Sequence, residues 1–229
     1  MGESTEDKVL HPLQNKPLLQ FSLEAFQQIT EIDHWILVYR DESQKEKCAE
    51  ICNKVLVPNT PVDWAQGGNQ RMDSVWAGLQ KIPHEERLVF IHDAARPFIQ
   101  PGTLKRLRDL AVKFGNATLA HRVTDTIKET PEPGSPVHQQ PLLTRDRARL
   151  WAMETPQVFQ RDLICQAYQK VFQEGVSLTD DAAALEYCGL PTTLLENPFP
   201  NPKITFPGDW VWAGYLLDSG IFDQTPTPD

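Results

Sequence analysis

The stretch VFIHDAARPF, residues 89–98, places a carboxylate and a guanidinium directly after an apolar run. If residues 88–92 form a buried strand of a parallel sheet, Asp93 falls at the carboxyl edge, where open α/β sheets bind their ligands. A carboxylate in that position can hold Mg²⁺, which prefers carboxylate oxygens together with substrate phosphates. Alternatively, Asp93 caps the next turn or pairs with Arg96. The residues of this stretch favour neither interpretation over the other.

A second stretch, AQGGNQRMDSVWAGL, has the composition of an anion-binding turn. Gly67 and Gly68 stand just before a predicted helix, and glycine lets the backbone approach a ligand closely. The start of a helix presents free N–H groups to an anion, and Arg71 and Ser74 would point toward the same region. The alternative is a plain tight turn with Asp73 as the N-cap of the helix. Two glycines before a helix do not decide between these interpretations.

Three basic residues lie beside predicted turns or strand edges rather than in helical runs of charge: Lys8, Arg147 and Lys203. Cations of this kind bind phosphate groups when the fold brings them together. Taken singly, each is a surface charge, and sequence spacing alone does not show whether they converge.

Apolar runs and helical periodicity alternate along most of the chain, which is typical of an α/β domain with a mainly parallel sheet. The runs are continuous rather than alternating, as in strands covered on both faces. Strands are predicted at 35–39, 88–92, 117–123, 192–196 and 203–206, and helices at 18–29, 41–55, 73–82, 101–115, 161–175, 179–189 and 209–220. The segments ETPQVF (154–159) and LTDDAAALE (178–186) are interpreted as polar turns without an assigned role.

Residues 128–143 interrupt this alternation with four prolines and a glycine, a composition that no core helix tolerates. The segment is therefore predicted to be a linker, a long loop or an arm that leaves the body of the domain. The polar, proline-containing tail at 223–229 is predicted to be disordered.

Composition narrows the class of protein. The 229 residues carry a net charge of −9, which argues against a protein that wraps nucleic acid but not against a local basic pocket for a nucleotide. No apolar run approaches the roughly 20 residues of a membrane span, and the first residues lack the apolar core of a secretory signal. Four scattered cysteines are too few for a disulfide framework, so buried thiols in a reducing cytoplasm are expected.

Six segments together resemble one family. GGNQRMDSVWAGL, FIHDAARPF, TDTIK, RDRARLWAMETPQVF, TDDAAALE and KITFPGDW occur in the order and at the separations typical of the 2-C-methyl-D-erythritol 4-phosphate cytidylyltransferases of non-mevalonate isoprenoid biosynthesis. The resemblance runs from about Lys8 to about Leu217. It implies a single domain over residues 1–222 with a Rossmann-like nucleotidyltransferase fold. It also implies a homodimer in which an arm at about 122–147 reaches the neighbouring subunit.

The resemblance further implies a reaction in which CTP and methylerythritol phosphate give the CDP-alcohol and pyrophosphate. By resemblance, Asp93 holds Mg²⁺, and the catalytic cations are Lys8, Arg147 and Lys203. The nucleotide side matches Gly67, Gly68, Arg71, Ser74, Asp93 and Ala94, and the methylerythritol phosphate side matches Arg96, Thr126, Arg147, Thr155 and Lys203. Thr126 and Arg147 lie on the expected arm, which would let them serve the partner's site.

One departure concerns the beginning of the chain. Family members place a strand and a glycine-rich loop before the part that matches EDKVLHPLQNKPLL, and Met1 and Gly2 match the end of that loop. The expected result is a sheet in which neighbouring strands stay unpaired and apolar surface is exposed. This departure leaves two interpretations: a natural protein that begins upstream of Met1 and has the loop, which the intact downstream motifs favour, or a truncated, inactive homologue that serves as a dimer partner. Independently of this departure, the shared motifs also leave open a sister cytidylyltransferase acting on ribitol 5-phosphate.

Overall fold

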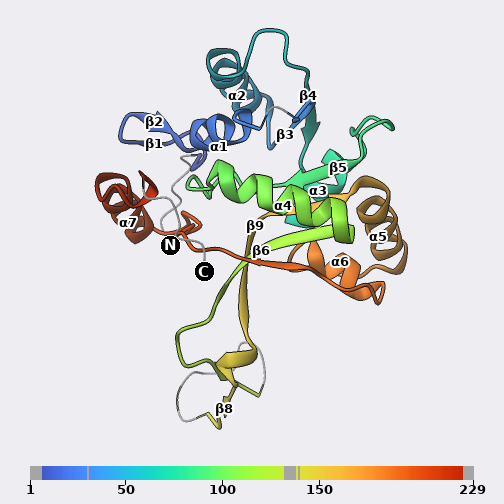
Figure 1. Ribbon diagram of the computed structural model, residues 1–229, viewed down its shortest axis with the longest axis vertical. Helices are drawn as coiled ribbons and strands as arrows, with labels where there is room; N and C mark the ends of the chain where they lie inside the picture. Colours follow the sequence, from blue (N-terminus) through green and yellow to red (C-terminus); the bar gives the residue numbers. More distant parts are fainter. Residues whose placement is uncertain (1–6, 30, 132–137, 139, 224–229) are drawn as a thin grey trace.

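The computed structural model describes residues 7–29, 31–131, 138 and 140–223 (Figure 1). Its helices are α1 (Leu18–Gln27), α2 (Glu42–Val55), α3 (Arg71–Leu79), α4 (Pro101–Phe114), α5 (Arg161–Glu174), α6 (Ala182–Tyr187) and α7 (Pro207–Asp218), with 3₁₀ turns η1 (Arg147–Arg149) and η2 (Ile221–Asp223). Its strands are β1 (Pro12–Leu13), β2 (Lys16–Pro17), β3 (Trp35–Tyr39), β4 (Val62–Gln66), β5 (Leu88–Ile91), β6 (Asn116–Arg122), β7 (Lys128–Glu129), β8 (Leu143–Thr144), β9 (Trp151–Gln160) and β10 (Leu194–Glu196).

Most predicted helices and strands are present, with shifts of a few residues at their ends. Helix α4 begins with Pro101 at its first turn and ends at Gly115, whose φ of 89° lies in the left-handed region that glycine adopts readily. Helix α2 is capped by Asp41, which accepts a hydrogen bond from the backbone N–H of Gln44 at 2.9 Å. These ends follow from local chemistry, which is why the sequence predicts them.

The prediction of a mainly parallel sheet is wrong for the larger sheet, whose strand order is β10-β6-β9-β5. Two of its three pairings, β6 with β9 and β5 with β9, are antiparallel. The sequence interpretation missed β9 because it treated residues 154–159 as a polar turn. In the structure Glu154, Thr155 and Gln157 are buried within the strand, and partners distant in sequence satisfy their polar atoms.

The prediction of a strand at 203–206 is also wrong. Ile204 makes one backbone hydrogen bond, from its N–H to the carbonyl of Ala95 at 2.8 Å. The next two N–H groups, of Thr205 and Phe206, donate instead to the Asp209 carboxylate at the start of α7, each at 2.7 Å. Because that carboxylate takes their donors, the segment is an extended loop that leads into the helix.

Helices cover both faces of the larger sheet (Figure 1). On one face Phe26 of α1 and Leu107 of α4 pack with Leu119 of β6. On the other face Tyr168 of α5 and Leu185 of α6 pack with Phe159 of β9. Burial of these large side chains is the main contribution to stability. Strand β5 therefore lies between two helical layers, with Leu88 and Phe90 packed against one and Val89 and Ile91 against the other.

The arm predicted at about 122–147 projects from the body between the end of β6 and the start of β9 (Figure 1). Strands β7 and β8 pair antiparallel within it. Residues 132–137 and 139, in its proline-rich part, lie outside the described residues, as do residues 224–229 of the predicted tail.

Cys48 and Cys52 are buried free thiols, as expected, and burial raises the pKa of Cys48 to about 12. Over the described residues, no helix has both the length and the apolar character that crossing a membrane requires.

Candidate active site

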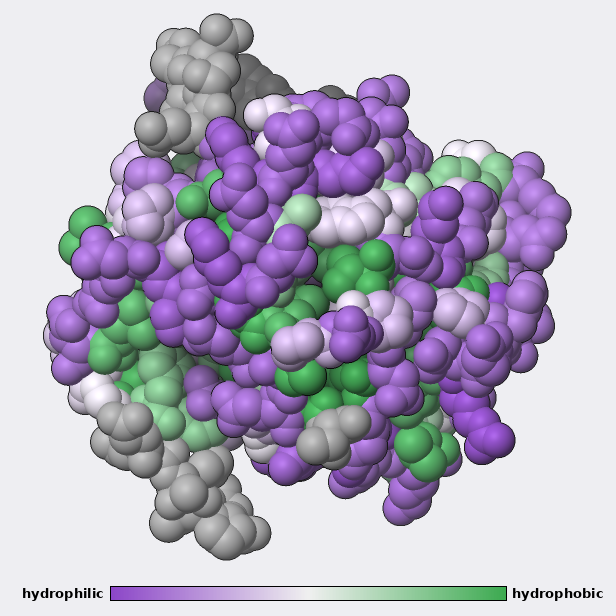
Figure 2. All heavy atoms as spheres, turned by 90° about the horizontal axis from the view of Figure 1, so that it is seen from above, coloured by the Kyte–Doolittle hydropathy of each residue, from purple (hydrophilic) through white to green (hydrophobic). Residues whose placement is uncertain are grey.

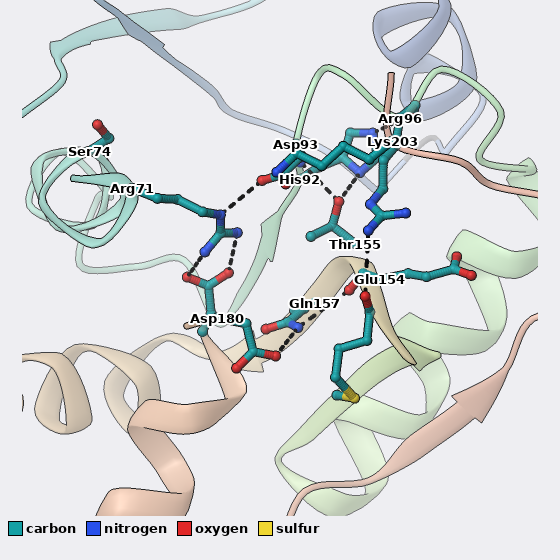
Figure 3. A network of polar contacts seen from close by, with 12 residues as sticks. Arg71, Ser74, His92, Asp93, Arg96, Glu154, Thr155, Gln157, Asp180 and Lys203 are labelled. Carbon is teal, nitrogen blue, oxygen red and sulfur yellow. Dashed lines mark hydrogen bonds and ion pairs between the residues drawn. The ribbon is translucent and has the colours of Figure 1, made fainter. Parts of the chain in front are cut away.

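The Asp93 carboxylate lies two residues after the end of β5 and contacts two cations (Figure 3). Arg71 donates from Nε to Oδ1 at 3.0 Å, and Lys203 donates from Nζ to Oδ2 at 2.6 Å. Burial alone would raise the pKa of Asp93, but the charge of Arg71 and the hydrogen bond from Lys203 outweigh it and lower the pKa to about 2. Asp93 is therefore a carboxylate at any pH at which the protein would work.

A second carboxylate, that of the fully buried Asp181, also binds Arg71. The NH1 and NH2 groups of Arg71 donate to the two oxygens of Asp181 at 3.0 and 2.7 Å, a bidentate pair. Asp181 is fully buried and also accepts from the Tyr168 hydroxyl at 2.5 Å. Burial opposes the charge on Arg71, yet Asp181 and Asp93 together raise its pKa above the ordinary value. The sequence analysis placed Arg71 on the nucleotide side, and the structure shows that it also joins α3 to α6.

A buried chain of hydrogen bonds orients the backbone at Asp93. The Asp93 N–H donates to Thr155 Oγ1 at 3.0 Å, and that oxygen lies 3.2 Å from Nδ1 of His92. Nε2 of His92 lies 3.1 Å from the carbonyl oxygen of Arg96, which can only accept, so Nε2 carries the proton. Nδ1 then accepts from the Thr155 hydroxyl. The ring thereby links β5, β9 and the turn that follows Asp93.

Burial lowers the pKa of His92 to about 4, so folding keeps this ring neutral. Between about pH 6.5 and pH 4 the unfolded chain binds a proton that the folded chain does not, and stability falls as the pH falls through that window. We expect a loss of about 3 kcal/mol in the free energy of unfolding across it from this residue. Urea unfolding at several pH values measures the slope. His92→Gln should remove this part of it, whereas His84→Gln, on the surface, should leave it; equal slopes in all three proteins would contradict the assignment.

The Arg96 side chain does not pair with the Asp93 carboxylate but binds backbone carbonyls. Its NH1 group donates to the carbonyl of Asn201 at 2.7 Å, and burial lowers its pKa although the Glu154 charge opposes this. Glu154 is itself buried and accepts from Asn197 at 2.9 Å and from Asn201 at 2.8 Å. The prediction that the Asp93 side chain pairs with Arg96 is therefore wrong, because the Arg96 guanidinium donates to the carbonyls of Asn201 and Met153. The turn is present, because the Arg96 N–H donates to the Asp93 carbonyl at 2.9 Å.

The glycine turn lies beside this network. The N–H of Gly68 donates to Ser74 Oγ at 3.2 Å, and a Cβ on Gly68 would stand 2.4 Å from that of Asp73. No side chain fits there without a shift of the backbone. The N-cap of α3 is Gln70 rather than Asp73, which instead accepts from the Gln70 N–H at 2.9 Å. Both glycines line a cavity together with Arg71, Ser74, Asp93 and Ala94.

The three predicted cations do not all converge. Lys203 reaches Asp93, and Lys8 donates to the carbonyl of Thr205 at 2.8 Å, on the same loop as Lys203. Arg147 lies on the arm, where it donates to the carbonyl of Thr124 at 2.5 Å. Thr126 lies on the arm as well, which leads away from the sheet (Figure 1). Within one chain, these two residues stay apart from Asp93.

A sequence model described as 2-C-methyl-D-erythritol 4-phosphate cytidylyltransferase matches residues 1–219. The chain belongs to this family. A cytidylyltransferase of that name from Desulforamulus reducens is 35% identical over 217 residues, which cover 95% of this chain and 90% of the relative. Another from a Synechococcus species is 37% identical over 214 residues, covering 93% and 90%.

Solved structures agree on the fold. The 4-diphosphocytidyl-2C-methyl-D-erythritol synthase of Anaerococcus prevotii gives a TM-score of 0.81 at 23% identity and covers 92% of this chain and 93% of its own. The 2-C-methyl-D-erythritol 4-phosphate cytidylyltransferase of Thermus thermophilus gives 0.75 at 25% identity, covering 92% and 94%. The predicted α/β fold class is thereby confirmed, with the sheet corrected to a mixed one.

In this cytidylyltransferase, the donor available to Mg²⁺ at the sheet edge is the single carboxylate of Asp93. No group of three His, Cys, Asp or Glu side chains that could hold a metal occurs in the part of the chain that the structure describes. Asp93 offers a single ionised carboxylate at the sheet edge, and Mg²⁺ commonly takes one or two carboxylates plus substrate phosphates. The chemistry of Asp93 therefore suits a metal that arrives with a triphosphate.

Sequence reasoning missed the residues that support this cytidylyltransferase site: His92, Glu154, Gln157, Asp181 and Asn201. The segment TDD, residues 179–181, did contain a signal for this site. Two adjacent carboxylates before an alanine-rich helix predict polar or cationic partners if they are buried. Asp180 accepts from the Ala183 N–H at 3.0 Å and from the Gln157 amide at 2.8 Å. Asp181 accepts hydrogen bonds from Arg71, which is 110 positions away in the sequence.

Proposed function

We propose that this chain transfers the cytidylyl group of CTP to 2-C-methyl-D-erythritol 4-phosphate, releasing pyrophosphate, as a step of non-mevalonate isoprenoid biosynthesis. The observation that carries the proposal is the position of the Asp93 carboxylate between Arg71 and Lys203, at the carboxyl end of β5. A glycine turn and a helix start lie beside it. One carboxylate, several cations and free backbone donors are the groups that phosphoryl transfer needs.

In this reaction an oxygen of the substrate phosphate attacks the α-phosphorus of CTP in line. The bond from that phosphorus to the oxygen bridging to the β-phosphate breaks, and pyrophosphate leaves with the electron pair. The protein mainly brings two anions together and neutralises their charge. Lys203 and Lys8 stand where they can bind phosphate oxygens, and Arg71 keeps Asp93 ionised. Asp93 would hold Mg²⁺, which would supply positive charge to neutralise the phosphates.

The nucleotide would bind at the glycine turn. Gly67, Gly68, Ser74 and Ala94 line the cavity beside Asp93, and the absence of a Cβ at the two glycines lets the turn pack closely against Ser74 and Asp73 of α3. Thr155 and Arg96 lie on the opposite side of Asp93, on β9 and on the turn after β5, which supports their assignment to the sugar-alcohol phosphate.

Arg147 and Thr126 would act on a neighbouring subunit's site in a homodimer. Two observations support this: the arm carries both residues away from Asp93, and it exposes apolar side chains at Ile127, Leu142 and Leu143. Exposed apolar groups on a projecting hairpin favour contact with a second chain.

The activity of a mixture of two inactive variants tests whether Arg147 acts in the active site of the neighbouring subunit. If Arg147 serves the partner's Asp93, equal amounts of Asp93→Asn and Arg147→Ala subunits form heterodimers in which one site is intact. Random exchange of subunits should then restore about a quarter of the wild-type rate. Each variant alone should stay inactive. No recovery after proven subunit exchange would place Arg147 in the site of its own chain.

A competition assay identifies the sugar-alcohol phosphate. CTP and Mg²⁺ are supplied with equal amounts of methylerythritol phosphate and ribitol 5-phosphate, and the two CDP-alcohols are separated by mass. We expect CDP-methylerythritol to dominate. Product formed only from ribitol 5-phosphate would overturn the proposed substrate.

A further inference from the structure

Glu154 is one of two acidic residues that are buried among the described residues, and the other is Asp181. Charged side chains otherwise lie mostly at the surface, and the face in Figure 2 is largely hydrophilic. A buried carboxylate is unfavourable unless its charge is compensated, as Arg71 compensates Asp181. In the described part of the chain Glu154 forms its ion pair with His121 instead, and that side chain is 53% exposed. An ion pair open to water contributes little stability, so the buried charge calls for another role.

Both oxygens of the Glu154 carboxylate accept hydrogen bonds from side chains. Oε1 lies 2.6 Å from Nδ1 of His121 on β6. Because a carboxylate can only accept, this Nδ1 carries the proton. Oε2 accepts from the amide nitrogens of Asn197 and Asn201, at 2.9 and 2.8 Å, in the segment after β10. The carboxylate therefore ties β9 to the end of β6 and to the segment after β10.

The two residues beside Glu154 on β9 hold the turn that carries Asp93. The Met153 carbonyl accepts from NH2 of Arg96 at 3.5 Å, and Thr155 Oγ1 accepts from the Asp93 N–H at 3.0 Å. Figure 3 shows Thr155 between Asp93 and Glu154. Three successive residues of one strand thus bind both the turn after β5 and the segment after β10.

Asn201 connects Glu154 to Arg96. Its side-chain amide donates to Glu154 and, at 3.0 Å, to the Thr155 carbonyl, which fixes its position. Its backbone carbonyl accepts from NH1 of Arg96 at 2.7 Å. Nε of Arg96 is buried and has no hydrogen-bond partner among the described residues. Burial lowers the pKa of Arg96, and the charge of Glu154 is the largest effect that opposes this. Glu154 is thus the buried countercharge of a guanidinium that neutral carbonyls hold.

Asn201 also limits where Lys203 can lie. Only Pro202 separates the two residues, and its ring fixes one backbone dihedral angle of this short link. On the other side of Lys203, the N–H of Ile204 donates to the carbonyl of Ala95 at 2.8 Å. The backbone is therefore tethered on both sides of Lys203, and one of these tethers depends on the Glu154 carboxylate.

We propose that Glu154 is a positioning residue, whose buried carboxylate sets Arg96 and Lys203 at the spacing that the sugar-alcohol phosphate requires. Its negative charge is needed, because it must accept from three donors and balance a buried guanidinium at the same time. Glu154 would touch neither substrate and would act through Asn201. This inference rests on the proposed function, in which Arg96 and Lys203 bind methylerythritol phosphate.

Steady-state kinetics of Glu154→Gln test this role. Glutamine has nearly the same shape, but it has no charge and carries a donor where Asn197 and Asn201 also donate. Pyrophosphate release is measured with saturating CTP and Mg²⁺ while methylerythritol phosphate is varied. We expect kcat/KM for methylerythritol phosphate to fall about 10²-fold, as a small displacement of positioning groups can cause. The dissociation constant of CTP, measured by calorimetry, should stay within about twofold, because the nucleotide is assigned to the glycine turn.

Hydrogen exchange without substrates measures the same effect independently of the reaction. The amide of Ile204 should exchange at least about tenfold faster in Glu154→Gln than in the wild type, because the loop has lost its tether at Asn201. Glu174→Gln is the matched control, since its exposed carboxylate accepts from the Tyr187 hydroxyl, and its kinetics and exchange should equal those of the wild type. A wild type that does not use methylerythritol phosphate would contradict the proposed function, whereas the exchange measurement would still test the tether.

A double variant shows whether Glu154 acts through Asn201. Asn201→Asp alone places two carboxylates together, and its kcat/KM for methylerythritol phosphate should fall at least as far as that of Glu154→Gln. Combining the two changes exchanges donor and acceptor and leaves one charge in the cluster, so kcat/KM should recover to within about tenfold of the wild type. The double variant also carries the test if Glu154→Gln alone does not fold.

Three results would overturn the inference. The first is a Glu154→Gln protein whose thermal midpoint falls while its kcat/KM and its hydrogen exchange stay unchanged, because the role is then only structural. The second is a loss of CTP affinity as large as the loss in the use of methylerythritol phosphate. The third is a double variant that is no more active than Asn201→Asp.

Discussion

Asp93→Asn should lower kcat by at least a factor of about 10³ while leaving the fold intact. The amide is almost the same size as the carboxylate, but it has lost the charge that faces Arg71 and Lys203. It would also be a poor ligand for Mg²⁺, which binds anionic oxygens by preference. The measurement is the steady-state rate of pyrophosphate release over a range of Mg²⁺ concentrations. Circular dichroism and the thermal midpoint should stay close to those of the wild type.

Asp109→Asn is the matched control, because Asp109 also pairs with an arginine but on the exposed surface of α4. Its rate should equal that of the wild type. If Asp93→Asn retains its activity, or if it loses activity only because it unfolds, Asp93 is not the metal-binding group of this site.

Arg71→Ala should destabilise the protein by about 3–5 kcal/mol in the free energy of unfolding. The change leaves the Asp181 carboxylate fully buried without the guanidinium that holds it, and a buried charge without a partner is strongly unfavourable. It also removes one of the two cations beside Asp93. Urea unfolding of the wild type and the variant measures the difference.

Two further proteins show whether the buried charge is the cause. Adding Asp181→Asn to Arg71→Ala should recover a large part of the lost stability, because no uncompensated charge remains. Arg108→Ala, which removes an arginine paired with surface carboxylates, should change stability by no more than about 1 kcal/mol. If Arg108→Ala and Arg71→Ala are equally destabilising, or if Asp181→Asn gives no recovery, the pair does not have the role assigned here.

The parts of the site that depend on local sequence could be predicted. An apolar run followed by a carboxylate placed Asp93 at a strand end, and two glycines before a helix placed Ser74 near it. Strand propensity and helix punctuation are local properties, so β3, β5, α2 and α4 were found close to their observed bounds. The resemblance then supplied the family, which the comparison confirmed over residues 1–219.

The remaining features depend on partners that sequence spacing does not reveal. Strand β9 contains Pro156 and several polar residues, and it is buried only because Asn201 and Asp180 satisfy Glu154 and Gln157. The mixed sheet follows from β9, since the chain returns from the arm against β6. Lys203 and Asp93 meet across 110 positions, as do Arg71 and Asp181. No periodicity or motif spacing carries information over such separations.

Pyrophosphate release from CTP by this chain, with methylerythritol phosphate and Mg²⁺ present, is the decisive measurement. We predict release that requires all three components, with one CDP-methylerythritol formed for each pyrophosphate. No release from a folded chain that binds CTP would contradict the proposed activity, and so would release that continues unchanged without methylerythritol phosphate.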